Sequence, residues 1–101
     1  MAHPFVHVEL NSTNLPKSKA FYKKLFKWKL TDVKSLGENY TMIDVGRGTG
    51  GGMLRQKMPK TPSLWMPYVL VDDIEKFTRQ AEKFGATVMK DVSEEIGRAH
   101  V

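Results

Sequence analysis

The sequence predicts a small α+β domain built from two βαβββ modules that form a curved mixed sheet with helices outside, the second module being incomplete. Segments with the two-residue alternation of strands and segments with helical spacing follow one another as strand, helix and three strands, and this order begins again after a linker. A shift of 59 residues also superposes the two beginnings, placing His7 on Met66 and Glu9 on Tyr68. The expected segments of this single domain, residues 1–101, are module one at about 4–56, a linker at 57–63 and module two at 64–101.

Module one begins with an alternating strand and an amphipathic helix. In the strand at residues 5–10, one side carries Val6, Val8 and Leu10, which we expect to pack on helices, and the other carries Phe5, His7 and Glu9. Apolar residues then recur at spacings of three and four from about residue 15 to residue 26, which predicts a helix with Pro16 in its first turn. Thr13 or Asn14 is the expected N-cap.

The rest of module one is predicted as three strands. Residues 28–33 and 40–45 form a hairpin around a Gly-Glu-Asn turn at 37–39, and a glycine-rich turn at 46–52 leads into a strand at 53–56. Its glycines match the G-x-G-x-x-G pattern of dinucleotide-binding proteins. No helix is expected after them, however, so a pyrophosphate would have no helix N-terminus to bind, and we interpret the segment as a hairpin turn.

Module two repeats the opening pattern. A strand is expected at residues 65–71, and a helix follows in which Asp72 is the N-cap and Glu75 completes an acidic version of the capping box. Gly85 stands where a left-handed residue ends a helix. The apolar stripe of this helix is Ile74, Phe77, Ala81 and Phe84. A strand at 86–90 and the beginning of another at 97–101 complete the predicted elements.

Composition restricts the class of protein. There is no cysteine, so disulfides, thiolate metal sites and cysteine nucleophiles are excluded. No apolar run approaches the roughly 20 residues that cross a bilayer, and residues 1–4 lack the pattern of a signal peptide, so we expect a cytoplasmic protein without a membrane partner. The net charge of +5 raises nucleic acid as a partner, but the lysines of the first helix are more typical of a solvated face.

Three segments carry a resemblance to a known family. "HVELNSTNLPKSKAFYKKLFKWKL", "YVLVDDIEKFTRQAEKFGATVMKDV" and "IGRAHV" resemble, in this order, the two module openings and a later strand of the glyoxalase/bleomycin-resistance/dioxygenase superfamily, also called the vicinal oxygen chelate group. Lys27 stands where relatives carry glycine, so a non-glycine residue is expected in the left-handed conformation. The strand that closes the second module in relatives does not follow "IGRAHV" in this sequence.

The resemblance implies a site on the first strand of each module. His7 occupies the position of the first metal ligand in metal-dependent relatives, and Glu9, on the same side, would be a second ligand or a general base. The equivalent position in module two is Met66, a poor ligand, and Gln56 is the remaining candidate donor. We therefore expect no cofactor and a degenerate divalent metal site. Candidate ligand-binding residues are Phe5, His7, Tyr40, Trp65, Met66 and Tyr68, and the alternative for the apolar ones is an ordinary core position.

The sequence is compatible with several functions. The leading hypothesis is a glyoxalase-like protein that binds a small organic molecule on the concave face of the sheet, with lyase, isomerase or dioxygenase chemistry as options. The alternatives are a resistance-type protein that sequesters its ligand without catalysis, and a basic module that associates with nucleic acid. A homodimer is also expected, because an incomplete module leaves an unpaired sheet edge.

Overall fold

The computed structural model describes residues 2–35, 38–89, 93–95 and 98–100, and confirms the α+β class. The elements are β1 (Phe5–Ser12), α1 (Leu15–Phe26), β2 (Lys29–Ser35), β3 (Glu38–Asp44), β4 (Gly51–Arg55), β5 (Leu64–Val69), α2 (Ile74–Lys83), β6 (Ser93–Glu95) and β7 (Arg98–His100). They fall into two compact units, one of residues 4–69 and one of residues 1–3 with 70–101. Each unit is described by itself.

The first helix forms where its sequence predicts it. Asn14 is the N-cap, and its side-chain oxygen accepts a hydrogen bond from the backbone N–H of Lys17 at 3.2 Å. The helix ends at Lys27, which adopts the expected left-handed conformation with φ 61° and donates its N–H to the Lys23 carbonyl. Capping at both ends therefore fixes the helix to the residues whose spacing predicts it.

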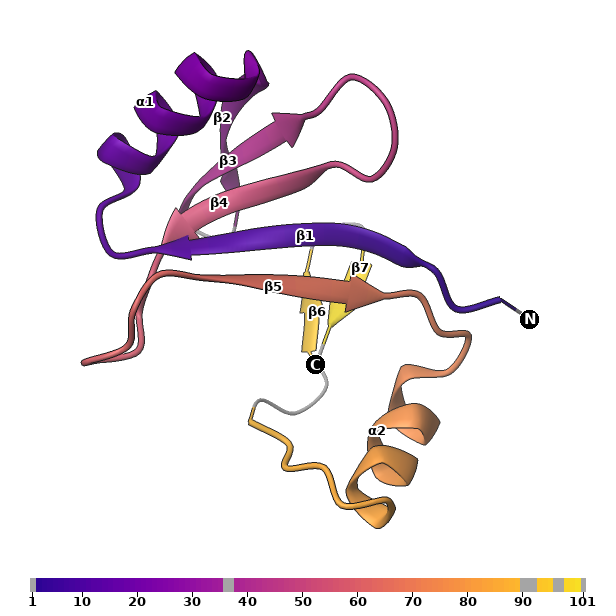
Figure 1. Cartoon of the computed structure of the whole chain (residues 1–101). Coiled ribbons are helices and arrows are strands. Elements are labelled where there is room, and N and C mark those ends of the chain that lie inside the picture. Colours follow the sequence, from indigo (N-terminus) through magenta and orange to yellow (C-terminus); the bar gives the residue numbers. More distant parts are fainter. Residues whose placement is uncertain (1, 36–37, 90–92, 96–97, 101) are drawn as a thin grey trace. The chain divides into compact units, whose positions relative to one another are not determined.

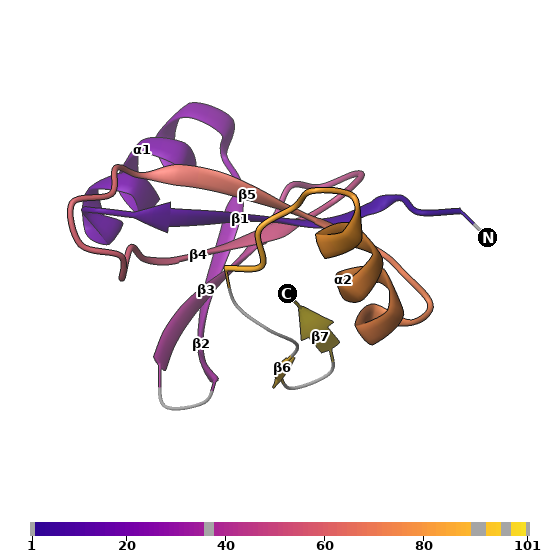
Figure 2. The ribbon, with the colours of Figure 1, turned by 90° about the horizontal axis from the view of Figure 1, so that it is seen from below.

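The larger unit contains an open five-stranded mixed sheet with the order β2-β3-β4-β1-β5 (Figure 1). β4 runs parallel to β1, whereas the β2–β3, β3–β4 and β1–β5 pairs are antiparallel. The predicted hairpin is confirmed as β2 and β3, which turn steeply away from β1 and β5 (Figure 2). Of its predicted turn, Gly37 lies outside the described residues, and Glu38 and Asn39 belong to β3.

The pairing of β1 with β5 is reciprocal. His7 lies opposite Tyr68 and Glu9 opposite Met66, while Val8 lies opposite Pro67. The shift of 59 residues matches His7 with Met66 and Glu9 with Tyr68. In the strand pair, His7 lies opposite the match of Glu9, and Glu9 lies opposite the match of His7. This is the arrangement that a local two-fold axis through Val8 and Pro67 requires. The repeat seen in the sequence is therefore a structural repeat, and α1 and α2 begin at equivalent residues of it.

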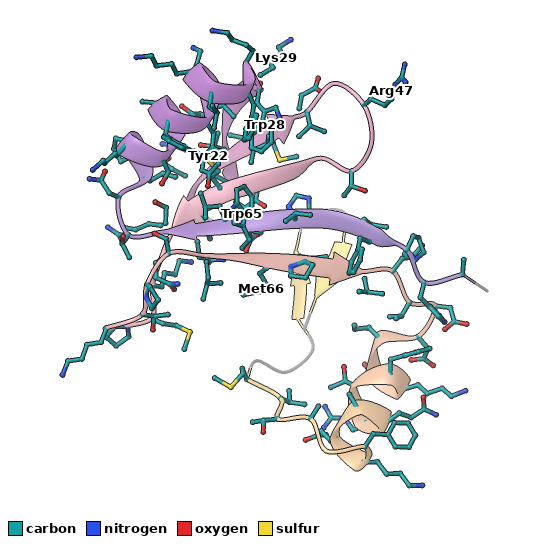
Figure 3. All side chains as sticks on the ribbon, viewed as in Figure 1. Tyr22, Trp28, Lys29, Arg47, Trp65 and Met66 are labelled. Atoms are coloured by element: carbon teal, nitrogen blue, oxygen red, sulfur yellow. The ribbon has the colours of Figure 1, made fainter. Side chains whose placement is uncertain are left out.

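The core of this unit lies between α1 and the sheet. Leu10, Ile43 and Met53 are buried, and partly buried apolar residues of α1, of β2 and of the chain next to β2 and β3 pack against them: Leu15, Tyr22, Trp28, Leu30 and Val45. Figure 3 shows Tyr22 and Trp28 on this side of the sheet, with ring centroids 5.5 Å apart. Val6, also expected to pack on a helix, is 47% exposed, and the β1–β5 register shifts beside it, between Phe5 and His7.

Gly51 explains where β4 begins. The strand begins at Gly51, earlier than the predicted Met53, and no helix follows the glycine-rich turn, as expected. Gly51 lies opposite Val8 in the parallel pair, and a Cβ on it would overlap the Val8 carbonyl oxygen. Absence of a side chain there lets β4 approach β1 closely.

The smaller unit corrects two predictions and contains one strand that was not expected. The N-cap of α2 is Asp73 rather than Asp72, because the Asp73 side chain accepts from the Lys76 N–H at 3.0 Å. Gly85 has φ +104° and ends the helix as predicted. Residues 86–89 form no strand, so the prediction for 86–90 is wrong over the described part and Lys90 lies outside it. β6 and β7 pair as an antiparallel hairpin, of which only the second strand was expected.

Candidate functional site

Three polar side chains form a hydrogen-bonded chain on the face of the sheet opposite α1. The Tyr40 hydroxyl donates to Oε2 of Glu9 at 2.8 Å, and lies 2.7 Å from Nε2 of His7. Since the phenol hydrogen goes to Glu9, the Tyr40 oxygen accepts the Nε2–H of His7. His7 and Glu9 are each only 6% exposed. This group, the Glu9–Tyr40–His7 triad, joins an acid, a hydroxyl and an imidazole from β1 and β3.

Gly52 makes room for the triad. Gly52 of β4 lies between the strands that carry Glu9 and Tyr40, and a Cβ on Gly52 would overlap the Oη, Cζ and Cε1 atoms of Tyr40. The Tyr40 ring therefore lies directly over the Gly52 backbone, which is how its hydroxyl spans β4 and reaches β1. The ring is nearly parallel to His7, with centroids 6.3 Å apart.

A straight row of residues crosses four strands at Glu9. Met42 of β3 lies opposite Gly52, Gly52 lies beside Glu9, and Glu9 lies opposite Met66 of β5. Because neighbouring strands lie about 4.8 Å apart, the Met42 and Met66 backbones are about 14 Å from each other. Their side chains are 41% and 42% exposed. Two accessible thioethers therefore flank the buried carboxylate.

The other predicted ligand-binding residues divide between the two faces. Tyr68 contacts the triad, since its ring packs edge-on against His7 with ring centroids 5.2 Å apart. Phe5, at the beginning of β1, is 63% exposed. Trp65 lies opposite Leu10 and points to the α1 side, where its Nε1–H donates to the Tyr22 hydroxyl at 3.4 Å. Figure 3 shows Trp65 and Met66 directed to opposite faces of the sheet.

The candidate metal donors do not fit a metal centre. His7 and Glu9 share a face, but the Tyr40 hydroxyl lies between them and bonds one donor atom of each. Gln56 follows β4 and binds backbone groups of the linker, donating to the Pro62 carbonyl and accepting from the Met58 N–H. Over residues 2–35, 38–89, 93–95 and 98–100, no cluster of three His, Cys, Asp or Glu side chains could hold a metal ion. His7 and Glu9 are instead joined by hydrogen bonds through Tyr40.

Sequence reasoning missed the link between these residues. Tyr40 was expected as a wall residue of a binding site, not as the bridge between His7 and Glu9, and Gly52 was assigned to a turn. The period-two alternation of β3 and β4 contains the necessary signal, because it places Tyr40, Met42, Gly52 and Leu54 on one face once the register is known.

Comparisons with known proteins agree with the fold. The family model described as Glyoxalase/Bleomycin resistance protein/Dioxygenase superfamily matches residues 5–99, which is nearly the whole chain. No curated protein matches the chain closely enough to serve as a relative. Neither described helix is long and apolar enough to span a membrane.

Proposed function

Because the chain belongs to the glyoxalase/bleomycin resistance protein/dioxygenase superfamily, we propose that it binds a small organic molecule on the sheet face that carries the Glu9–Tyr40–His7 triad. The observation that carries the proposal is the triad itself. Burying a carboxylate and an imidazole costs free energy, and a sheet stabilised by packing alone has no need of them on this face. Two half-exposed methionines in the same row as Glu9, Met66 beside it and Met42 two strands away, add an apolar, adaptable surface for the rest of a ligand.

The triad also suits proton transfer. Glu9 is the base that can remove a proton from a bound molecule, and Tyr40 is the adjacent hydroxyl that can hydrogen bond an oxygen of the same molecule. A lyase or isomerase that moves a proton beside a carbonyl can use these two groups. A ligand-sequestering protein is the second candidate, favoured by the exposed Met42 and Met66, which offer contact area without chemistry.

A thermal-shift screen with small organic compounds tests the proposal. A ligand at about ten times its Kd raises the free energy of unfolding by about 1.4 kcal/mol, which moves the Tm of a domain of this size by several degrees. Glu9→Gln and Tyr40→Phe should lose the shift, and Tyr22→Phe, which removes a hydroxyl on the α1 side, should keep it. A shift that survives Glu9→Gln and Tyr40→Phe would place binding elsewhere.

Turnover separates the two candidate functions. A lyase or isomerase should change a ligand from the screen into a product, and Glu9→Gln should slow that change by about 100-fold or more, the usual contribution of a general base. A sequestering protein should return the ligand unchanged and should bind it as tightly after prolonged incubation.

We also propose that two chains associate. β5 is the outermost strand of its sheet and pairs only with β1 among the described strands, so its other edge presents backbone groups able to pair with a second chain. Half-exposed apolar residues on β5, Met66 and Val69 among them, would gain burial in such a contact. Light scattering at micromolar concentration should return about twice the chain mass of 11.5 kDa; a monomer mass refutes the association.

A further inference from the structure

The unshared oxygen of Glu9 indicates which class of molecule the site takes. Glu9 is 6% exposed, and its Oε2 is bound by Tyr40, but Oε1 accepts no hydrogen bond from any residue that the structure describes. Among the described residues, Asn11 Nδ2 is the one side-chain nitrogen or oxygen that is both fully inaccessible to solvent and without a hydrogen-bond partner. Glu9 Oε1 has no partner either, but it is not fully inaccessible. Oε1 therefore reaches the surface, although the rest of its side chain is buried.

No ion pair among the described residues balances the charge on this carboxylate. The ion pairs of the described residues join Lys19 to Asp32 and Arg79 to Glu82, and neither involves Glu9. The imidazole of His7 is separated from the carboxylate by the Tyr40 hydroxyl, which takes its Nε2–H. A buried carboxylate with one hydrogen bond from a neutral phenol is poorly compensated, so a positively charged donor would stabilise it.

The surroundings of Oε1 define the rest of the ligand. Met66 lies beside Glu9 on β5, and Tyr68 follows it two residues along the same strand. On the other side, Met42 lies two strands away, and the Tyr40 ring lies over Gly52, between Met42 and Glu9. Thioethers and phenol rings contact apolar groups well, and the face of a phenol ring also attracts cations. An ammonium group that carries an aromatic or aliphatic body matches both features.

We propose that the ligand of the triad face is a small organic cation, an inference that rests on the proposed function. Its ammonium or amidinium N–H donates to Glu9 Oε1, and its apolar body lies on Met42 and Met66. A carboxylate or phosphate in the same place would be repelled by Glu9. A neutral alcohol would lack the added strength of a charge-assisted hydrogen bond, which is roughly twice that of a neutral one.

Three probes that share a ring and differ in charge test the class: benzylamine, benzyl alcohol and benzoate. Each is titrated into protein labelled with ¹³C at the methionine methyl groups, at about 0.15 M salt so that the net charge of +5 is screened beyond about 8 Å. Benzylamine should shift the Met42 and Met66 signals with a Kd at least about tenfold lower than that of benzyl alcohol, and benzoate should cause no shift.

Substitution of Glu9 identifies the charged partner. Glu9→Gln keeps the size of the side chain and an acceptor for the Tyr40 hydroxyl, and should weaken benzylamine about tenfold while leaving benzyl alcohol unchanged. Glu75→Gln, the same change at an exposed position of α2, is the control and should change neither.

The possible outcomes separate this inference from the function beneath it. If benzyl alcohol or benzoate binds at Met42 and Met66 as tightly as benzylamine, the cation class is wrong and the binding face stands. If benzylamine binds equally to the Glu9→Gln variant, Glu9 is not its partner and the inference falls. If none of the three probes shifts either methionine, the inference falls as well, and a negative thermal-shift screen would then remove the proposed function too.

Discussion

Replacement of Gly52 by alanine tests the central geometry of the site. The new Cβ would lie closer than 3.0 Å to three atoms of the Tyr40 side chain, a separation that real Cβ atoms do not show. The neighbour that must give way is a side chain rather than backbone, so we expect the Tyr40 ring to rotate off β4. Its hydroxyl would then lose both hydrogen bonds, leaving Glu9 and His7 buried with fewer partners.

The expected cost follows from these two effects. Overpacking of a close contact costs about 1–3 kcal/mol, and each lost hydrogen bond about 1 kcal/mol, with more for the bond to the carboxylate. The sum is about 3–5 kcal/mol, a large part of the roughly 5–15 kcal/mol that stabilises a domain. Urea unfolding followed by circular dichroism measures this cost directly.

A double-mutant cycle with Tyr40→Ala shows whether the ring is the cause. Without the ring, Gly52→Ala meets no obstacle from Tyr40 and should cost almost nothing, or even stabilise the strand, since alanine is preferred to glycine there. The coupling between the two changes should therefore be at least about 2 kcal/mol. An equal cost of Gly52→Ala in both backgrounds would refute the placement of Tyr40 over Gly52, and with it the triad.

The remaining predictions concern single positions. Lys27→Gly should raise the free energy of unfolding by about 1 kcal/mol in urea titration, because glycine adopts the left-handed conformation at this C-cap without strain; no gain would mean that Lys27 is unstrained. Hydrogen bonds from Lys19 and then Thr41 lower the pKa of Asp32 below its ordinary value of 3.8, so the carboxylate stabilises the fold above that pH and the contribution disappears as pH falls through the lowered pKa. Wild type should therefore exceed Asp32→Asn in stability at neutral pH and converge with it in acid, and a difference independent of pH would contradict the assignment. Asn11→Leu should not destabilise the protein and should gain about 1 kcal/mol, because it removes the buried Nδ2, which has no partner among the described residues; a loss above about 1 kcal/mol would show that the amide has a partner.

Local signals in the sequence were sufficient for the helices and for the repeat. Pro16 follows the N-cap and Gly85 follows α2, and each needs only its immediate neighbours to act. The shift of 59 residues needs no structure either, yet the reciprocal β1–β5 register reproduces it. Features that depend on short stretches of chain were therefore predictable, with errors of one or two residues such as the N-cap at Asp73.

Features that depend on distant partners were not predictable in the same way. Residues 86–89, Ala-Thr-Val-Met, have the composition of a strand, but a strand also needs a neighbour to pair with, and composition does not supply one. The hydroxyl bridge of Tyr40 depends on three strands being in register, with a glycine in the middle one. The sequence shows the glycine and the tyrosine separately, but only the register of the folded sheet brings them together.

Trp65 shows that one misplacement was avoidable. The shift that places His7 on Met66 and Glu9 on Tyr68 also places Val6 on Trp65. It therefore assigns Trp65 to the helix-facing side of the strand, and Met66 and Tyr68 to the polar side. Its pairing with Leu10 and its contact with Tyr22 agree with that assignment. The face of the sheet on which an aromatic residue lies is therefore better predicted from its position in the repeat than from its side-chain chemistry. Applied to β5, this rule leaves Met66 and Tyr68 as the residues that share a face with Glu9 and His7, and these are the two that lie opposite them in the strand pair.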